Sequence, residues 1–136
     1  METESKKILI VDDDSFLLDM YALKFSESNF NVSTALGSES ALEKLRGGLS
    51  PEIILLDIMM PVMNGFELLT KIREENISPD SIIIFLSNMG QPSDITQVET
   101  SGATGYIVKA SSTPSEVIDK VINIINKNPS TGGKKE

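Results

Sequence analysis

Four short, uninterrupted apolar runs are the strongest constraint on how this chain can fold. They are residues 8–11 (ILIV), 53–56 (IILL), 82–86 (IIIFL) and 106–108 (YIV). Runs this short and rich in β-branched residues are typical of strands buried on both faces, as in a parallel sheet. A fifth segment, residues 31–34, alternates polar and apolar residues in the manner of an edge strand. The pattern predicts a five-stranded parallel sheet.

The segments between the runs have the apolar spacing of helices. Helices are expected at residues 15–28, 38–46, 66–75 and 92–101, and from residue 114 onward. The segment 92–101 is the poorest of these, because its Thr and Ser residues are weak helix formers. Alternating strands and helices with right-handed crossovers predict an α/β, flavodoxin-like, doubly wound sheet of order 2-1-3-4-5, with five helices on both faces.

Helix ends and buried stripes can be predicted in more detail. Asp14, Ser38 and Thr113 are expected as N-caps, and Glu116 would complete a capping box with Thr113. The stripe of the first helix is expected to consist of Phe16, Leu17, Met20, Leu23 and Lys24, which lie close to a 3.6-residue period. That of the last helix is expected to consist of Val117, Ile118, Val121, Ile122 and Ile125.

Composition narrows the possible functions. The chain of 136 residues has the size of one domain, expected to span residues 1–128, and residues 129–136 have the composition of a disordered tail. It contains no cysteine and no histidine, which excludes thiolate metal sites, disulfides and Ser/His/Asp triads. A net charge of −8 argues against direct nucleic-acid binding. No run approaches a membrane span or a signal sequence, so we expect a cytoplasmic protein with no membrane contact.

The residue after each apolar run is polar and reactive. The runs are followed by Asp12, Asp13 and Asp14, then by Asp57, Ser87 and Lys109. Parallel sheets bind their ligands beyond the carboxyl ends of the strands. Carboxylates, a hydroxyl and an ammonium group are therefore expected together at one edge. Asp14 is better explained as the helix N-cap than as part of this group.

The expected cluster has an excess of negative charge. Two carboxylates about 4 Å apart repel by roughly 4 kcal/mol at an effective dielectric of about 20. Lys109 alone cannot neutralise Asp12, Asp13 and Asp57. An oxygen-only site favours a hard cation such as Mg²⁺, which keeps positions for phosphate oxygens. Asp57 could then serve as a nucleophile that forms an aspartyl-phosphate, with Ser87 and Lys109 stabilising the phosphoryl oxygens.

The same segments resemble a known family. KILIVDDD, IILLDIMMPVMNG, IIIFLSNMG and GYIVKA are similar to the signature segments of bacterial and archaeal response-regulator receiver domains, over residues 6–128. The resemblance is to the stand-alone, chemotaxis-regulator-like type. It implies a two-component or phosphorelay switch that takes a phosphoryl group from a sensor histidine kinase or a histidine phosphotransfer protein, and then changes its binding to a downstream protein.

The resemblance also implies residue roles. Asp57 corresponds to the phosphoryl acceptor and Lys109 to the phosphate-pairing lysine. Asp13 would hold Mg²⁺ directly and Asp12 through water, and Met59 would add its backbone carbonyl.

Further positions correspond to the moving parts of the family. Ser87 matches the switch hydroxyl and Tyr106 the switch aromatic residue. Pro61 and Gly65 match turn residues of the loop after the acceptor.

Two departures from the family pattern leave alternatives open. Asn88 stands where the family usually has a small residue, and Ala110 stands where a proline commonly follows the lysine. These features favour a pseudo-receiver, an interaction module that is never phosphorylated. A magnesium-dependent phosphohydrolase is a second alternative, although Met59 occupies the position where such enzymes carry another aspartate.

Overall fold

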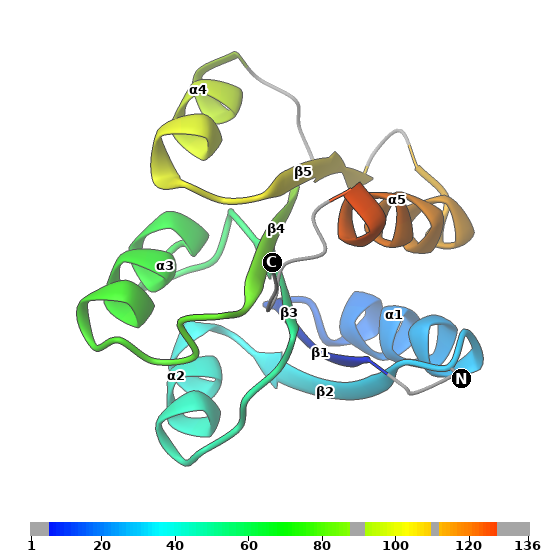
Figure 1. Ribbon diagram of the computed structural model, residues 1–136, viewed down its shortest axis with the longest axis horizontal. Coiled ribbons are helices and arrows are strands. Elements are labelled where there is room, and N and C mark those ends of the chain that lie inside the picture. The colour runs from blue at the N-terminus through cyan, green and yellow to red at the C-terminus, as the bar shows by residue number, and fades with distance from the viewer. Residues whose placement is uncertain (1–5, 88–91, 110–111, 128–136) are drawn as a thin grey trace.

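The computed structural model describes residues 6–87, 92–109 and 112–127. Strands and helices alternate along the chain (Figure 1). The elements are β1 (Lys7–Asp12), α1 (Ser15–Glu27), β2 (Asn31–Leu36), α2 (Ser38–Arg46), β3 (Ile53–Asp57), α3 (Gly65–Glu74), β4 (Ile82–Ser87), α4 (Pro92–Ser101), β5 (Gly105–Val108) and α5 (Pro114–Lys127). The expected tail at residues 129–136 lies outside the described residues.

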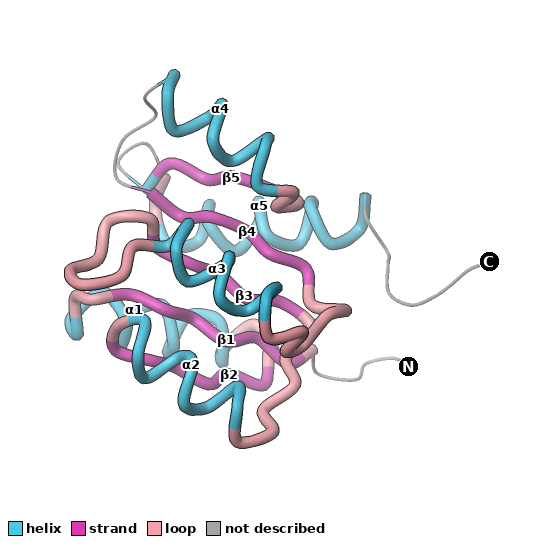
Figure 2. Tube along the Cα trace, turned by 90° about the vertical axis from the view of Figure 1, so that its left-hand side faces the viewer, coloured by secondary structure: helices cyan, strands magenta, loops and turns pink. Residues whose placement is uncertain are grey.

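The sheet has the predicted topology. Five parallel strands lie in the order β2-β1-β3-β4-β5. Helices α1 and α5 cover one face, and α2, α3 and α4 cover the other, which is the face turned toward the viewer in Figure 2. The polar strand β2 lies at an edge, as its alternating sequence predicts. The flavodoxin-like doubly wound fold is thus confirmed.

Each face of the sheet has its own core. In β1 and β3 successive side chains point to opposite faces, so Leu9 and Leu56 pack under α2 and α3, whereas Ile10 and Leu55 pack under α1 and α5. Burial of each such side chain contributes about 1.5–3 kcal/mol to stability. Double-sided burial explains why these runs contain no polar residue. Within the described residues, no helix combines the length and the apolar character that a membrane span requires.

The predicted stripe of α1 is only partly right, because Leu17 and Met20 pack against the core as partly buried side chains but Phe16 and Leu23 do not. Phe16 and Leu23 are 75% and 59% exposed, and the buried side chains are those of Leu18, Tyr21 and Phe25. Apolar residues occur on nearly every side of α1, so spacing alone permits two stripes. Packing against α5 and the sheet selects the one that contains Phe25, whose ring meets Phe30 edge-on with centroids 5.0 Å apart.

The last helix departs from its predicted stripe at a single position. Ile122 is 38% exposed, whereas the other four predicted residues are buried.

Two of the three predicted N-caps are confirmed. The Asp14 carboxylate accepts from the backbone N–H groups of Phe16 and Leu17. Thr113 and Glu116 form the reciprocal bonds of a capping box. Ser38 was predicted wrongly, because Gly37 is the N-cap of α2 and the Ser38 hydroxyl donates elsewhere.

The phase of α1 can be tested by stability. Phe25→Ala should lower the free energy of unfolding by about 3–5 kcal/mol, because it leaves a cavity in the core. Phe16→Ala should change it by less than about 0.5 kcal/mol, because the ring is exposed. Urea unfolding followed by circular dichroism measures both values, and a larger loss for Phe16→Ala would contradict this packing.

Candidate functional site

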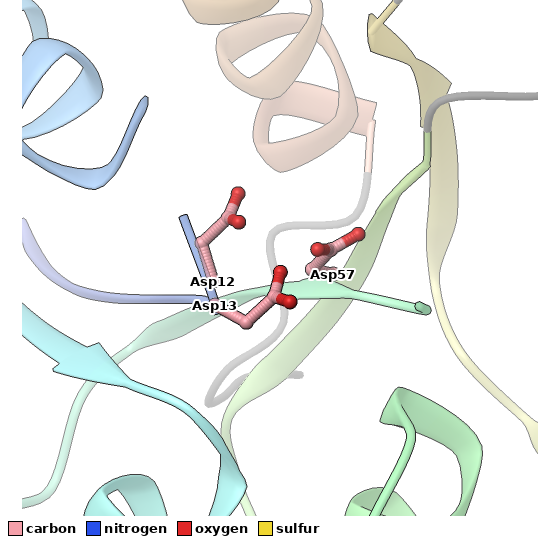
Figure 3. Close-up of side chains that lie close together, drawn as sticks. All are labelled: Asp12, Asp13 and Asp57. Carbon is pink, nitrogen blue, oxygen red and sulfur yellow. The ribbon is translucent and has the colours of Figure 1, made fainter. Parts of the chain in front are cut away.

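Three carboxylates meet where β1 and β3 end. Asp12 and Asp57 are the last residues of these strands, and Asp13 follows Asp12. One carboxylate oxygen from each lies within 4.8 Å of the others. Figure 3 shows the three side chains pointing to the same side of the strand ends. Asp12 and Asp57 are buried, at 1% and 4% exposure, whereas Asp13 is exposed. The site is an acidic cluster of two buried carboxylates and one exposed carboxylate.

A buried lysine lies against this acidic cluster. Lys109 directly follows β5, and its Nζ lies 3.0 Å from Asp12 Oδ2 and 3.7 Å from Asp57 Oδ2. Ser87, the last residue of β4, is also buried, and the residue before it, Leu86, pairs with Asp57. The carboxyl ends of four strands therefore bring together the predicted residues Asp12, Asp57, Ser87 and Lys109.

Three carboxylates and the Lys109 ammonium group leave an excess of negative charge at the carboxyl ends of these strands. Burial is the main cause that raises the pKa of the Asp57 carboxyl, to about 7; Lys109 opposes this rise, and Asp12 and Asp13 add to it. Asp57 Oδ1 is buried and has no hydrogen-bond partner among the described residues. A buried oxygen without a partner is unfavourable unless something else compensates it. The site thus favours an additional cation.

The donor set fits Mg²⁺. The three side chains offer only carboxylate oxygens, and the chain contains no histidine or cysteine that would favour a softer metal. The unpartnered Asp57 Oδ1 provides a free ligand atom, and the exposed side of Asp13 leaves room for water or phosphate oxygens.

The loop after Asp57 is held in a tight conformation. Gly65 donates its N–H to the Ile58 carbonyl at 2.9 Å, and a Cβ at this position would clash with the Asp57 carbonyl oxygen. Only glycine allows α3 to begin so close to the end of β3.

The next turn of this loop carries backbone strain. Val62 has a φ of 72° at the centre of a turn that Met63 N–H closes by donating to Pro61 O at 2.7 Å. Sequence reasoning did not find this strain, because a β-branched residue gives no signal for a positive φ. Met59 lies earlier in the loop, and its side chain is largely exposed.

The remaining predicted positions lie beside the site or outside the description. Tyr106 is half-buried in β5, opposite Phe85, and packs against the core under α2, α3 and α4. Asn88 and Ala110, the two departures from the family pattern, lie outside the described residues.

Comparison with known proteins assigns the family. Residues 8–122 match the response regulator receiver domain. The chain belongs to this family. Receiver domains are signalling modules that interact with histidine kinases or phosphotransfer proteins and with downstream targets. The match covers most of the chain and includes every strand, so the fold, the acidic cluster and the family agree.

Individual relatives differ in what surrounds the receiver domain. The chain is 34% identical over 123 residues to the chemotaxis protein CheY of Thermotoga maritima, covering 90% of this chain and 98% of that protein. It is also 34% identical to the transcriptional regulatory protein SrrA of Staphylococcus aureus, covering 93% of this chain and 51% of SrrA. A Bacillus licheniformis protein-glutamate methylesterase matches with 34% identity, and the chain spans 36% of its length. The chain thus spans about half or less of several relatives.

Solved structures agree with the fold. A chemotaxis response regulator of Vibrio cholerae superposes with a TM-score of 0.80 at 27% identity, covering 88% of this chain and 98% of that one. A CheY-like receiver domain of Methanospirillum hungatei gives a TM-score of 0.79 at 27% identity, with 90% and 95% covered.

The raised pKa of Asp57 predicts a pH-dependent stability in EDTA. The folded chain binds the Asp57 proton more tightly than the unfolded chain does, so ionised Asp57 destabilises the fold as pH rises from about 4 through 7. Asp57→Asn removes this penalty. We expect the variant to be more stable than the wild type at about pH 8, by on the order of 2 kcal/mol, and equally stable near pH 4.

Urea unfolding at the two pH values measures this difference. Addition of Mg²⁺ should stabilise the wild type and leave Asp57→Asn nearly unchanged, because the variant lacks one of the carboxylates. Equal stability of both proteins at high pH without metal would contradict the charge imbalance.

Proposed function

We propose that the chain is a phosphorylation-activated switch of a two-component or phosphorelay system, with Asp57 as the phosphoryl acceptor. The observation that carries the proposal is the buried, unpartnered Asp57 Oδ1 at the end of β3, with two further carboxylates and the Lys109 ammonium around it. We assign the receiver domain to residues 1–128 and expect it to act in the cytoplasm.

The phosphoryl transfer follows from these positions. A carboxylate oxygen of ionised Asp57 attacks the phosphorus of a phosphohistidine; the P–O bond forms, and the P–N bond breaks. The imidazole nitrogen keeps the electron pair and takes up a proton. Water later attacks the phosphorus, the P–O bond to Asp57 breaks, and inorganic phosphate and a proton leave, which restores the carboxylate. We expect the chain to assist only its own phosphorylation and dephosphorylation and not to act as an enzyme on another substrate.

The surrounding residues supply charge and orientation. Mg²⁺ held by Asp12, Asp13, Asp57 and the backbone carbonyl of Met59 would neutralise the carboxylates and the phosphoryl oxygens. Lys109 lies 3.7 Å from Asp57 Oδ2, close enough to pair with a phosphoryl oxygen once the aspartate is modified. Before Asp57 is modified, the 3.0 Å bond from Lys109 to Asp12 holds the ammonium group at the site.

We propose that phosphorylation changes a binding surface formed by α4, β5 and α5. Phosphorylated Asp57 carries up to about two negative charges, and we expect the Ser87 hydroxyl and the Tyr106 ring to respond to it. Helix α4 has few stabilising contacts. Val98 alone is buried among its described side chains. The Thr100 hydroxyl donates to carbonyl oxygens of its own helix and so adds no contact to the rest of the fold. Elements of low local stability are those that move in switches.

The phosphoryl donor is proposed to dock on α1. Phe16 and Leu23 are exposed apolar side chains of this helix and form the proposed docking stripe, which begins three residues after Asp13. Spacing of i and i+7 places both side chains on one side of the helix, which is suited to packing against a partner helix. A histidine kinase or phosphotransfer protein bound there would have its phosphohistidine within reach of Asp57.

Intact-mass spectrometry tests the acceptor directly. After incubation with acetyl phosphate and Mg²⁺, the wild-type chain should gain one phosphoryl group, and Asp57→Asn should gain none. EDTA should abolish the gain in the wild type. Labelling that persists in Asp57→Asn would place the modification elsewhere and contradict the proposal.

The docking stripe has a separate test. Phe16→Ser combined with Leu23→Ser should slow transfer from phosphorylated histidine kinases at least about tenfold, because the partner loses apolar contact area. Labelling by acetyl phosphate should stay within about twofold of wild type, since no helix has to dock. Ile122→Ser, an exposed apolar residue on α5, is the matched control. Equal slowing with both donors would refute a docking role for the stripe.

The alternatives are weaker. The comparisons give no support to the pseudo-receiver, and acetyl phosphate labelling decides the point. A phosphohydrolase would need a second acid two residues after Asp57, and Met59 offers only an exposed thioether there. We expect no repeated turnover of phosphate esters.

A further inference from the structure

The turn between β2 and α2 bonds both to the end of β1 and to the loop after β3, the two segments beside the acidic cluster. Gly37 donates its N–H to the Asp12 carbonyl at 2.9 Å. The next residue, Ser38, donates its hydroxyl to the Met63 carbonyl at 2.7 Å. Asp12 ends β1, and Met63 lies in the loop that follows Asp57. Two consecutive residues thus link the β1 end to the loop after β3.

The Ser38 hydroxyl has no capping role that would explain its position. Although Ser38 is the first residue of α2, the N-cap is Gly37, and no side chain caps this helix. Ser38 is 4% exposed, and its Oγ lies 3.9 Å from Met60 Sδ in addition to its bond with Met63 O. Both contacts are made to the same loop, so the side chain is directed at the loop and not at its own helix.

The conformation of this loop requires stabilising contacts from residues outside the loop. The turn at Val62 has a positive φ in a β-branched residue that is 91% exposed, so its own side chain gains no packing there. Such backbone conformations are unfavourable by about 1–3 kcal/mol and persist only where neighbouring contacts fix them. The bond from Ser38 is made to Met63, the residue whose N–H closes this turn.

We propose that Ser38 is a positioning residue for the cation site: its hydroxyl fixes the loop of residues 58–64, so that the Met59 carbonyl is held in place to bind Mg²⁺ beside Asp57. Ser38 itself does not contact the ion. The inference rests on the proposed function, because it takes the same cation as its object. Outer residues that orient metal ligands commonly contribute a factor of about 10–100 to metal affinity.

Isothermal titration calorimetry with Mg²⁺ tests the role. Ser38→Ala should raise the Mg²⁺ dissociation constant about threefold to tenfold, because the loop loses its anchor. Ser38→Thr keeps the hydroxyl and should bind within about twofold of wild type. Ser38→Cys keeps the volume but donates weakly, so it should lie between them, and it carries the test if Ser38→Ala does not fold.

The chain offers a matched control at the amino ends of the strands, opposite the carboxylates. The Ser81 hydroxyl donates to the Pro51 carbonyl at 2.5 Å and so joins two loops in the same manner, far from the carboxylates. Ser81→Ala should lower the unfolding midpoint as Ser38→Ala does, while its Mg²⁺ affinity stays at the wild-type value.

Phosphorylation kinetics give a second readout. In Ser38→Ala the Mg²⁺ concentration for half-maximal labelling by acetyl phosphate should rise by the same factor as the dissociation constant, while the rate at saturating Mg²⁺ stays within about twofold of wild type. A rate that falls at saturation with unchanged Mg²⁺ dependence would overturn the proposal.

The calorimetric outcomes also distinguish failure of the inference about Ser38 from failure of the proposed function. Unchanged Mg²⁺ affinity in a folded Ser38→Ala would leave the hydroxyl with a purely structural role and overturn the inference. If the wild type binds Mg²⁺ but is never labelled at Asp57, the proposed function fails while the role of Ser38 in cation binding is still measured. If Ser38→Thr binds as weakly as Ser38→Ala, the hydroxyl is not the relevant group, and the inference fails.

Discussion

The repulsion among Asp12, Asp13 and Asp57 is the interaction on which the rest of the structure depends. The sheet concentrates these acids at one edge, and the Lys109 ammonium, shared between Asp12 and Asp57, compensates them in part. Burial removes the water that would otherwise screen the charges, and the pKa of Asp57 rises as a result. A site with this excess of negative charge is stabilised when it binds a dication, alone or together with an anionic group.

The fold maintains the imbalance through rigid supports. Asp12 and Asp57 end strands that are buried on both faces, so neither carboxylate can turn away into solvent without disturbing the core. The backbone around them is tied as well: Gly65 packs on the Asp57 carbonyl, and Gly37 bonds the Asp12 carbonyl. The elements proposed to move lie on the other side of the site, where β4 leads into the weakly held α4.

Sequence reasoning worked best where periodicity and topology act together. Asp57 and Lys109 were placed correctly at one edge because each follows a buried run and parallel strands deliver their carboxyl ends to the same side. Asp14 and Thr113 were identified as caps because capping is a local interaction that depends on a few neighbouring residues.

The features that were missed depend on contacts between distant segments. The phase of α1 is set by packing against α5, so the choice between Phe16 and Phe25 as core residue could not be made from spacing. Ser38 has the sequence context of an N-cap, and only the folded chain brings Met63 within reach of its hydroxyl. The strain at Val62 is likewise a product of the closed loop.

The most direct test of the charge imbalance is to locate the cation. Crystals grown with Mn²⁺ as a substitute for Mg²⁺ should show one anomalous peak at the carboxyl edge, about 2.0–2.3 Å from carboxylate oxygens of Asp13 and Asp57 and from the Met59 carbonyl. That result would show that the acids form a single cation site. A structure at saturating Mn²⁺ with no peak at this edge, and with Asp57 Oδ1 bonded to another protein group, would contradict the account.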